Sequence, residues 1–285
     1  MLLGLACALG AVAPGAPAQP LLSVALRWDN DILAVRGEGA PPDYDYTQGL
    51  QLAVELAPMP VGGGGRRGYR FALGQRIYTP RRDAAQPIPG ERPYAGWLYG
   101  LAQVRQSRGS REYELEAEAG VTGPPALGEP VQNGIHRLVG SQRQVGWAHQ
   151  LAFEPAFVLR GRVRRPLERR SVVLQPYAEA GLGTLWSGVA AGAGVRAGAG
   201  DGTHGLYASA ALRQEWVAHN LFLDGNTFRA SVRAERREWV TELRGAVGGQ
   251  HGHWALEYEA VLRTAEYAAQ PKPHLYGALS LRWRR

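Results

Sequence analysis

Cysteine is almost absent from this chain of 285 residues, because the single Cys7 lies close to the amino terminus. One thiol excludes an internal disulfide and a zinc site built from several cysteines. Lysine is nearly absent as well, since Lys272 is the only lysine among 32 basic residues. Arginine therefore carries the positive charge, and its planar guanidinium binds phosphates and carboxylates through paired hydrogen bonds.

The balance of charge is basic, with a formal net charge of +7 and a pI near 9.8. A basic balance indicates an anionic partner. Nucleic acid is one candidate and the phosphates of a lipopolysaccharide surface are another. An amino-terminal sequence typical of exported proteins argues for the lipopolysaccharide surface, and we expect no nucleic-acid partner. The alternative explanation is that arginine replaces lysine because of the base composition of the genome.

Long apolar runs are confined to the amino terminus. Residues 2–12 are apolar and precede Ala16-Pro17-Ala18, a small-x-small pattern that signal peptidases cleave, although no basic residue comes before the run. We predict a signal peptide over residues 1–18, which contains Cys7, and a single mature domain over residues 19–285. Beyond the signal no run reaches the ~18 apolar residues of a membrane helix. A membrane protein with this sequence could only be a closed barrel.

Alternating aliphatic and polar residues recur in segments of about ten, the length of a tilted membrane-spanning strand. In residues 49–56 every second residue is Leu or Val, and in residues 112–119 every second residue is Glu. A continuous row of carboxylates is tolerated in a barrel lumen, whereas Arg or Lys facing lipid near the midplane costs ~2–4 kcal/mol. The glutamate row is therefore expected to face the lumen.

Thirteen segments show this alternation: residues 22–28, 49–56, 69–78, 97–105, 112–119, 150–163, 172–183, 191–199, 206–217, 228–236, 238–247, 253–264 and 275–283. Bacterial barrels have an even number of strands, so we predict twelve, with one segment a loop or two forming one strand. Tyr and Trp recur near the segment ends, as at membrane interfaces. The predicted fold is all-β, an antiparallel transmembrane β-barrel of about twelve strands.

Residues 123–141 break the strand rhythm. Pro130 suits a first helical turn, apolar residues follow at helical spacing, and Gly140 suits a helix end. We predict a short helix in an extracellular loop. Gln132 and His136 are four residues apart and so leave the same face of this helix. A histidine oriented by an amide can act as a general base; the alternative is a polar pair on the surface of a loop helix.

A second polar cluster ends the first predicted strand, at Asp29-Asn30-Asp31, and is matched by Asp43 and Asp45 at the start of the next. Oxygen ligands of this kind suit a hard cation such as Ca²⁺. The alternative is a polar hairpin end that uses Asx turns. No Gly-x-Ser-x-Gly elbow is present, which disfavours a serine esterase. The remaining scheme is hydrolysis in which a cation stabilises the oxyanion while His136 draws a proton from water.

Taken together, these residues resemble the LpxR family of outer-membrane lipid A 3'-O-deacylases. Each matching motif is ordinary by itself, but the occurrence of so many motifs in the same order is a specific signal for the family. In chain order they are Asn30-Asp31, Tyr46-Thr47-Gln48-Gly49, Arg92-Pro93-Tyr94-Ala95-Gly96-Trp97-Leu98-Tyr99, Gln132-Asn133-Gly134-Ile135-His136, Gly146-Trp147-Ala148-His149-Gln150-Leu151, Glu154-Pro155 and Leu223-Asp224-Gly225-Asn226-Thr227-Phe228. Gln48 departs from the family, which usually has Asn there.

The resemblance implies a twelve-stranded barrel with its site between the wall and an extracellular helix. It implies calcium-dependent removal of the 3'-linked acyloxyacyl chain from lipid A, in contact with outer-membrane lipids. In that comparison Asp31, with Asn30, helps to hold Ca²⁺, His136 activates water, and Gln132 and Thr47 orient groups around it. We expect a monomer in the bacterial outer membrane with its site on the extracellular side.

Two further questions of interpretation are left open by the sequence. His149, Glu154 and Asn226 either support the site or simply satisfy one another's hydrogen bonds. The whole chain could also be a non-enzymatic barrel, a small pore or a structural protein, as charged alternate faces such as residues 112–118 allow. A loop helix carrying His136 is the feature that a pore does not need.

Overall fold

The structure is a computed structural model that describes residues 20–34, 44–201 and 203–285. The predicted signal peptide over residues 1–18, the predicted start of the mature chain and Asp43 lie outside the described residues. Within them, no helix combines the length and the apolar character needed to cross a membrane.

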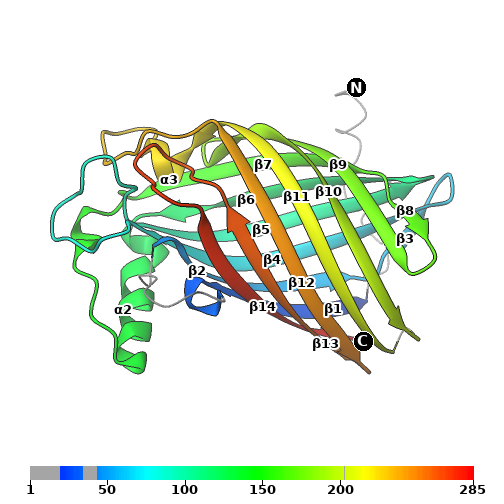
Figure 1. The fold of residues 1–285 in the computed structure, drawn as a ribbon. Helices are drawn as coiled ribbons and strands as arrows, with labels where there is room; N and C mark the ends of the chain where they lie inside the picture. Colours follow the sequence, from blue (N-terminus) through cyan, green and yellow to red (C-terminus); the bar gives the residue numbers. More distant parts are fainter. Residues whose placement is uncertain (1–19, 35–43, 202) are drawn as a thin grey trace.

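Twelve long antiparallel strands form a closed barrel, which confirms the predicted fold class (Figure 1). Neighbours along the chain pair with one another, and β14 closes the barrel on β1 through pairs such as Leu26 with Leu281. Two short strands, β3 (Met59–Val61) and β8 (Leu167–Arg169), pair with β4 and β9. The long strands are β1 (Leu21–Asn30), β2 (Asp45–Leu56), β4 (Gly65–Thr79), β5 (Ala95–Arg108), β6 (Arg111–Thr122), β7 (Glu154–Arg164), β9 (Val172–Gly183), β10 (Trp186–Gly200), β11 (His204–Asn220), β12 (Trp239–His251), β13 (Trp254–Arg263) and β14 (His274–Arg284).

Twelve of the thirteen predicted segments overlap these strands, and residues 228–236 are the exception. They form part of the loop before β12, with only an isolated bridge from Arg236 to Tyr267. The carboxylate of Glu154 accepts hydrogen bonds from the backbone N–H groups of Thr227 and Phe228. The N–H of Ala234 donates to the carbonyl oxygen of Leu223. Isolated side-chain and backbone contacts therefore replace the ladder of a strand, and the alternating pattern there was misleading.

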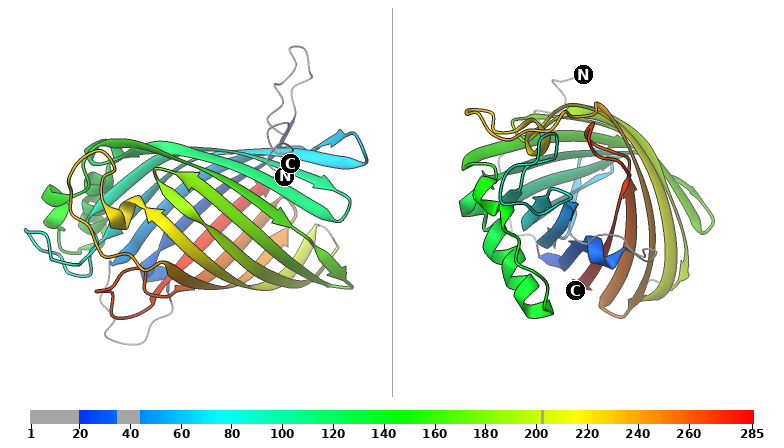
Figure 2. Two further views of the ribbon diagram at one scale, coloured as in Figure 1. Left: turned by 90° about the horizontal axis from the view of Figure 1, so that it is seen from above. Right: turned by 60° about the vertical axis from the view of Figure 1, so that its left-hand side comes forward.

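The two ends of the barrel differ, as Figures 1 and 2 show. One end, which we call the turn end, carries compact hairpins such as β5–β6 and β12–β13 and the end of the chain. The other, the loop end, carries α2 (Gly128–Val139), α3 (Leu221–Asp224) and the long connections over residues 80–94 and 264–273. Three short 3-10 helices also lie in loops at this end: η2 (Asp31–Leu33), η3 (Pro124–Ala126) and η4 (Gly146–His149).

Alternation along each strand separates an apolar outer face from a polar lumen. On β4 the side chains of Phe71 and Leu73 are 44% and 70% exposed on the outside, while Arg70 and Arg76 line the lumen. Leu50 on β2 and Leu98 on β5 are exposed on the outer face in the same way. An apolar outside is what contact with lipid requires.

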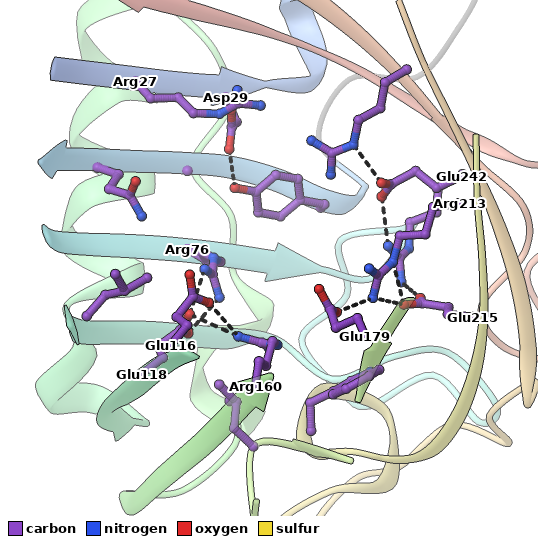
Figure 3. A pocket seen from close by; sticks show the side chains of 18 of the residues that line it. Arg27, Asp29, Arg76, Glu116, Glu118, Arg160, Glu179, Arg213, Glu215 and Glu242 are labelled. Carbon is purple, nitrogen blue, oxygen red and sulfur yellow. Dashed lines mark hydrogen bonds and ion pairs between the residues drawn. The ribbon is translucent and has the colours of Figure 1, made fainter. Parts of the chain in front are cut away.

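Ion pairs fill much of the lumen (Figure 3). The predicted glutamate row faces inward, and Glu114, Glu116 and Glu118 contact arginines of neighbouring strands. Glu118 is only 1% exposed; it accepts two hydrogen bonds from Arg76, at 2.8 and 3.0 Å, and one from Trp97 Nε1 at 2.7 Å. Because an unpaired buried charge is strongly unfavourable, these pairs hold the facing strands in register.

Replacing Glu118 by Ala should destabilise the barrel by about 3–5 kcal/mol, because two guanidinium groups would lose a buried counter-charge. Urea unfolding of the protein refolded into lipid vesicles measures this difference. E112Q is the matched control, since Glu112 lies on the same strand and makes no ion pair among the described residues. Equal unfolding midpoints for E118A and E112Q would contradict the assigned role.

Candidate active site

The predicted helix is present as α2, within the predicted range. It starts after Leu127, whose φ of 59° is left-handed, and Pro130 stands in its first turn. Gly140 ends it with a φ of 73°, a conformation that favours glycine, and donates its N–H to the carbonyl oxygen of His136. Gln132 and His136 are both buried, so they face the protein rather than solvent.

This helix lies against the outer face of the wall. Gly96 of β5 has the same orientation as the exposed Leu98, and a Cβ there would lie 3.1 Å from both Ala126 Cβ and Gly128 N. Ile77 of β4 is fully buried and packs with Tyr94, Trp147 and Val131 of α2. The turned view in Figure 2 shows the helix alongside the barrel rather than across its mouth. Residues between α2 and the wall therefore belong to the lipid-facing side.

His136 is held in one tautomer by a backbone group. Its Nδ1 lies 2.5 Å from the carbonyl oxygen of Gln142, and the side chain is 7% exposed. A carbonyl oxygen can only accept, so Nδ1 must carry the hydrogen. The other ring nitrogen, Nε2, is then the basic one. This is the arrangement that a general base needs.

Gln132 is oriented by Trp147. The indole Nε1 donates to Gln132 Oε1 at 2.8 Å, and both side chains are almost fully buried. An indole N–H is a donor only, so the amide oxygen must face it and the amide nitrogen must face away. The sequence comparison included Trp147 within a motif but gave it no role.

One carboxylate fixes the segment that carries Trp147. Asp83 accepts hydrogen bonds from the backbone N–H groups of Val145 and Gly146 at 3.0 Å and from the hydroxyl of Tyr94 at 2.7 Å. The side chain of Asn133 on α2 adds two hydrogen bonds to the backbone of Gln144. The loop that orients both Gln132 and His136 is thus tied to the barrel and to the helix.

Asn30 and Asp31 stand where β1 ends and η2 begins. Asn30 Oδ1 accepts from Ile32 N at 2.8 Å, which is the Asx-type contact that we considered as the alternative. Asp31 is fully buried, and its Oδ2 accepts from Tyr44 N at 3.1 Å. Asp29 points the other way, into the lumen, where it binds Arg27 and Tyr46.

Asp45, the first residue of β2, is held by residues from two loops. Tyr267 donates to Asp45 Oδ1 at 3.0 Å, and Arg92 lies 3.7 Å from the same oxygen. Tyr267 comes from the loop before β14, so this contact joins that loop to the first residue of β2. Burial, and then the adjacent Asp45 carboxylate, raise the pKa of the Tyr267 hydroxyl, which therefore stays protonated as the donor.

Thr47 sits at a β-bulge. Tyr46 pairs with Tyr78 and Gln48 with Ile77, so Thr47 is the extra residue between two regular pairs of β2 and β4. Its hydroxyl lies 2.7 Å from that of Thr79, and both residues are buried. Bulges occur next to active sites because they redirect a side chain. No sequence signal pointed to Thr79, since its role depends on the register of the two strands.

The predicted site residues share one strip at the loop end. Strands β1, β2, β4 and β5 are neighbours, with η2 at the end of β1, Thr47 on β2 and α2 over β4 and β5. Because neighbouring strands lie ~4.8 Å apart, β1, which ends at η2, and β4, which lies under α2, are two strand spacings apart along the sheet, about 10 Å.

The oxygen donors of Asn30 and Asp31 fit a hard cation such as Ca²⁺ better than a soft one. This pair contains a single carboxylate, and the described part of the chain holds no group of three His, Cys, Asp or Glu arranged for a metal. Further ligands would have to be neutral oxygens of the backbone, water or substrate.

Glu154 and Asn226, which were candidates for a supporting role, satisfy each other instead. Asn226 Nδ2 donates to Glu154 Oε2 at 3.0 Å, and Asn226 also bonds both backbone groups of Ala152. They clamp the loop before β7 to the loop after α3. This contact explains their place in the motifs without chemistry.

Comparison with known proteins gives a consistent picture. LpxR from Salmonella typhimurium is similar over 92% of this chain and all of that chain, with a TM-score of 0.80 and 20% identity. The β domain of the Bordetella autotransporter Brka is similar over 92% of this chain and 98% of that chain, with a TM-score of 0.52 and 13% identity. At these identities the likeness shows the fold. No curated protein sequence matches the chain.

A family model described as outer membrane protein LpxR matches residues 2–285, which is nearly the whole sequence. The match confirms the family that the ordered motifs indicated, and it agrees with the structural likeness over the barrel. The chain therefore belongs to the LpxR family of outer membrane proteins.

Proposed function

We propose that this protein is a calcium-dependent esterase that removes the 3'-linked acyloxyacyl chain from lipid A. The observation that carries the proposal is that α2, with Gln132 and His136, packs on the outer, lipid-facing side of the wall. On the same strands, nearer the turn end, lie the exposed Leu50, Leu73 and Leu98. A lipid ester could reach the site sideways from the membrane, with its acyl chains against this apolar surface.

The proposed orientation follows from the two ends of the barrel. In bacterial outer-membrane barrels the short turns are periplasmic and the longer loops are extracellular. The loop end, with α2 and the site, then faces outward at the level of the outer leaflet, where the phosphates and sugars of lipopolysaccharide lie. A basic chain with 31 arginines suits that surface.

In the proposed reaction His136 Nε2 takes a proton from a water molecule as the water oxygen attacks the ester carbonyl carbon. The bond to the sugar oxygen then breaks, and the proton passes from the imidazolium to that oxygen. The products are a free carboxylic acid and a sugar hydroxyl. Gln132 and Thr47 orient groups around the histidine. A Ca²⁺ ion held by Asp31 and Asn30 would supply positive charge for the oxyanion.

A small pore is the alternative function. Water-accessible space inside the lumen favours it, but ion pairs such as Arg213 with Glu179 cross that space (Figure 3). A pore predicts conductance steps in planar bilayers from the wild type and from a His136 variant alike.

His136→Ala should lower the deacylation rate by about 10²–10⁴, the usual contribution of a general base. Mass spectrometry of lipid A from an outer membrane containing the variant measures the loss of the 3' chain. H251A is the matched control, because His251 is exposed at the turn end. Undiminished 3' deacylation by H136A would show that the assigned base is wrong.

Chelation should abolish activity, and added Ca²⁺ should restore it with half-saturation in the range of about 10⁻⁴–10⁻³ M. A site with one carboxylate belongs to the weak class of calcium sites, because affinity rises with the number of charged ligands. D31N should shift the half-saturating concentration upward while leaving the barrel folded. Full activity in excess EDTA would exclude the cation from the mechanism.

Trp147→Phe keeps an aromatic ring but removes the donor that orients Gln132. A hydrogen bond of this kind contributes about 1 kcal/mol, so kcat should fall about fivefold with KM unchanged. W254F is the control, since Trp254 is exposed at the turn end. A rise in KM with unchanged kcat would mean that Trp147 contacts the substrate instead.

A further inference from the structure

Two chambers in the described part of the lumen differ in their electrostatics. The central chamber, of about 670 Å³, lies between Arg76, Glu118, Arg213 and Glu215 (Figure 3). The turn-end chamber, of about 540 Å³, is lined by Arg196, Tyr207, Glu257, Arg282 and Arg284 among others. Arg27, Gln51 and Arg70 line both and so mark the boundary between them.

In the central chamber the arginines are neutralised by carboxylates. Among the described residues, eight of the nine arginines that line it form ion pairs, and Arg70 is the exception; the eight are Arg27, Arg76, Arg160, Arg162, Arg164, Arg213, Arg244 and Arg263. The single carboxylate of Glu179, for example, accepts hydrogen bonds from both Arg162 and Arg213. This chamber needs no added counter-ion.

The turn-end chamber lacks that compensation. Four of its arginines, Arg70, Arg196, Arg282 and Arg284, have no carboxylate partner within the residues that the structure describes. Glu257 is the one acidic side chain among the described residues that line it, and its carboxylate is taken by the hydroxyl of Tyr207 at 2.6 Å. The chamber therefore carries a clear excess of positive charge.

Its arginines are held toward the lumen by the strand pattern. On β14 Arg282 and Arg284 line the chamber, while the intervening Trp283 and the adjacent Leu281 face outward. Arg282 and Arg284 are solvent-exposed although they lie inside the wall, so water and dissolved ions can reach them. Turning them outward would place charge in lipid at a cost of up to ~2–4 kcal/mol each, depending on depth.

The guanidinium group of Arg196 stacks on an aromatic ring. Its guanidinium carbon lies 3.6 Å from the centre of the Tyr207 ring. The ring crosses Gly248 of the next strand, where a Cβ would lie 2.4 Å from it, and its hydroxyl reaches Glu257 on β13. Glycine is thus required for the ring to lie flat. A guanidinium stacked in this way keeps its N–H groups in plane for an anion.

We propose that the turn-end chamber binds a soluble anion bearing more than one phosphate group. Several guanidinium groups around one cavity suit phosphate oxygens, which arginine binds in pairs of hydrogen bonds. The volume is in the range of small-ligand sites, about 300–1,000 Å³. Membrane lipids are excluded as ligands because the chamber lies inside the wall. The site is at the opposite end from the histidine site and does not depend on the hydrolase proposal.

Titration calorimetry of the refolded, detergent-solubilised chain with inorganic pyrophosphate at fixed ionic strength tests the proposal. The wild type should give saturable binding. R196Q/R282Q should bind about 100-fold more weakly, roughly tenfold for each lost paired contact. R169Q is the matched control, since it removes an exposed charge near the turn end outside the chamber, and its affinity should stay within about twofold of the wild type. H136A should bind like the wild type.

A second variant guards against a folding defect in the double substitution. R282K keeps the charge but loses the planar fork, so it should bind pyrophosphate several-fold more weakly while unfolding like the wild type. Absence of saturable binding to the folded wild type would overturn the proposal. An equal loss of affinity in R169Q and R196Q/R282Q would overturn it too, because binding would then follow net charge rather than the chamber.

Discussion

Closure of the sheet is the constraint on which the rest of this structure depends. In hydrocarbon a backbone N–H or C=O without a partner costs several kcal/mol, so a membrane-spanning sheet must have no free edge. Pairing of β14 with β1 removes the edge, and from then on each residue faces either lipid or lumen. Polar groups on the outer face are tolerated only beyond the apolar belt. The loop end of β1, β2 and β4 meets that condition, and the histidine site is built there.

Much of the fold could be predicted from the sequence because the two-residue alternation of apolar and polar side chains has a physical cause. Lipid on one side and water on the other impose this alternation on each strand, so the alternation alone identified segments that overlap all twelve long strands. The prediction for residues 228–236 was wrong because the same alternation arises in a loop, whose first backbone N–H groups are bound by the carboxylate of Glu154. That contact depends on a carboxylate far away in the sequence, which a local pattern does not contain.

The candidate site was predictable only in part, for a similar reason. Helical spacing brings Gln132 and His136 to one face, and ordered motifs linked them to Asn30, Asp31 and Thr47. Helical spacing and motif order do not identify the groups that orient these side chains. Thr79 depends on strand register, Trp147 on the fold of a loop, and the partner of His136 is a carbonyl oxygen, which every residue has. Asp29 and Asp45 are adjacent to the site in sequence but serve other contacts.

That carbonyl has an evolutionary consequence. The tautomer of His136 is set by the main chain at Gln142, so no exchange of side chain at that position can delete the acceptor. Selection can act on it only through loop length and backbone path between Gly140 and Trp147. A homologue could therefore change the side chain at position 142 and keep the acceptor, whereas an insertion or deletion that moves the backbone at Gln142 would remove it.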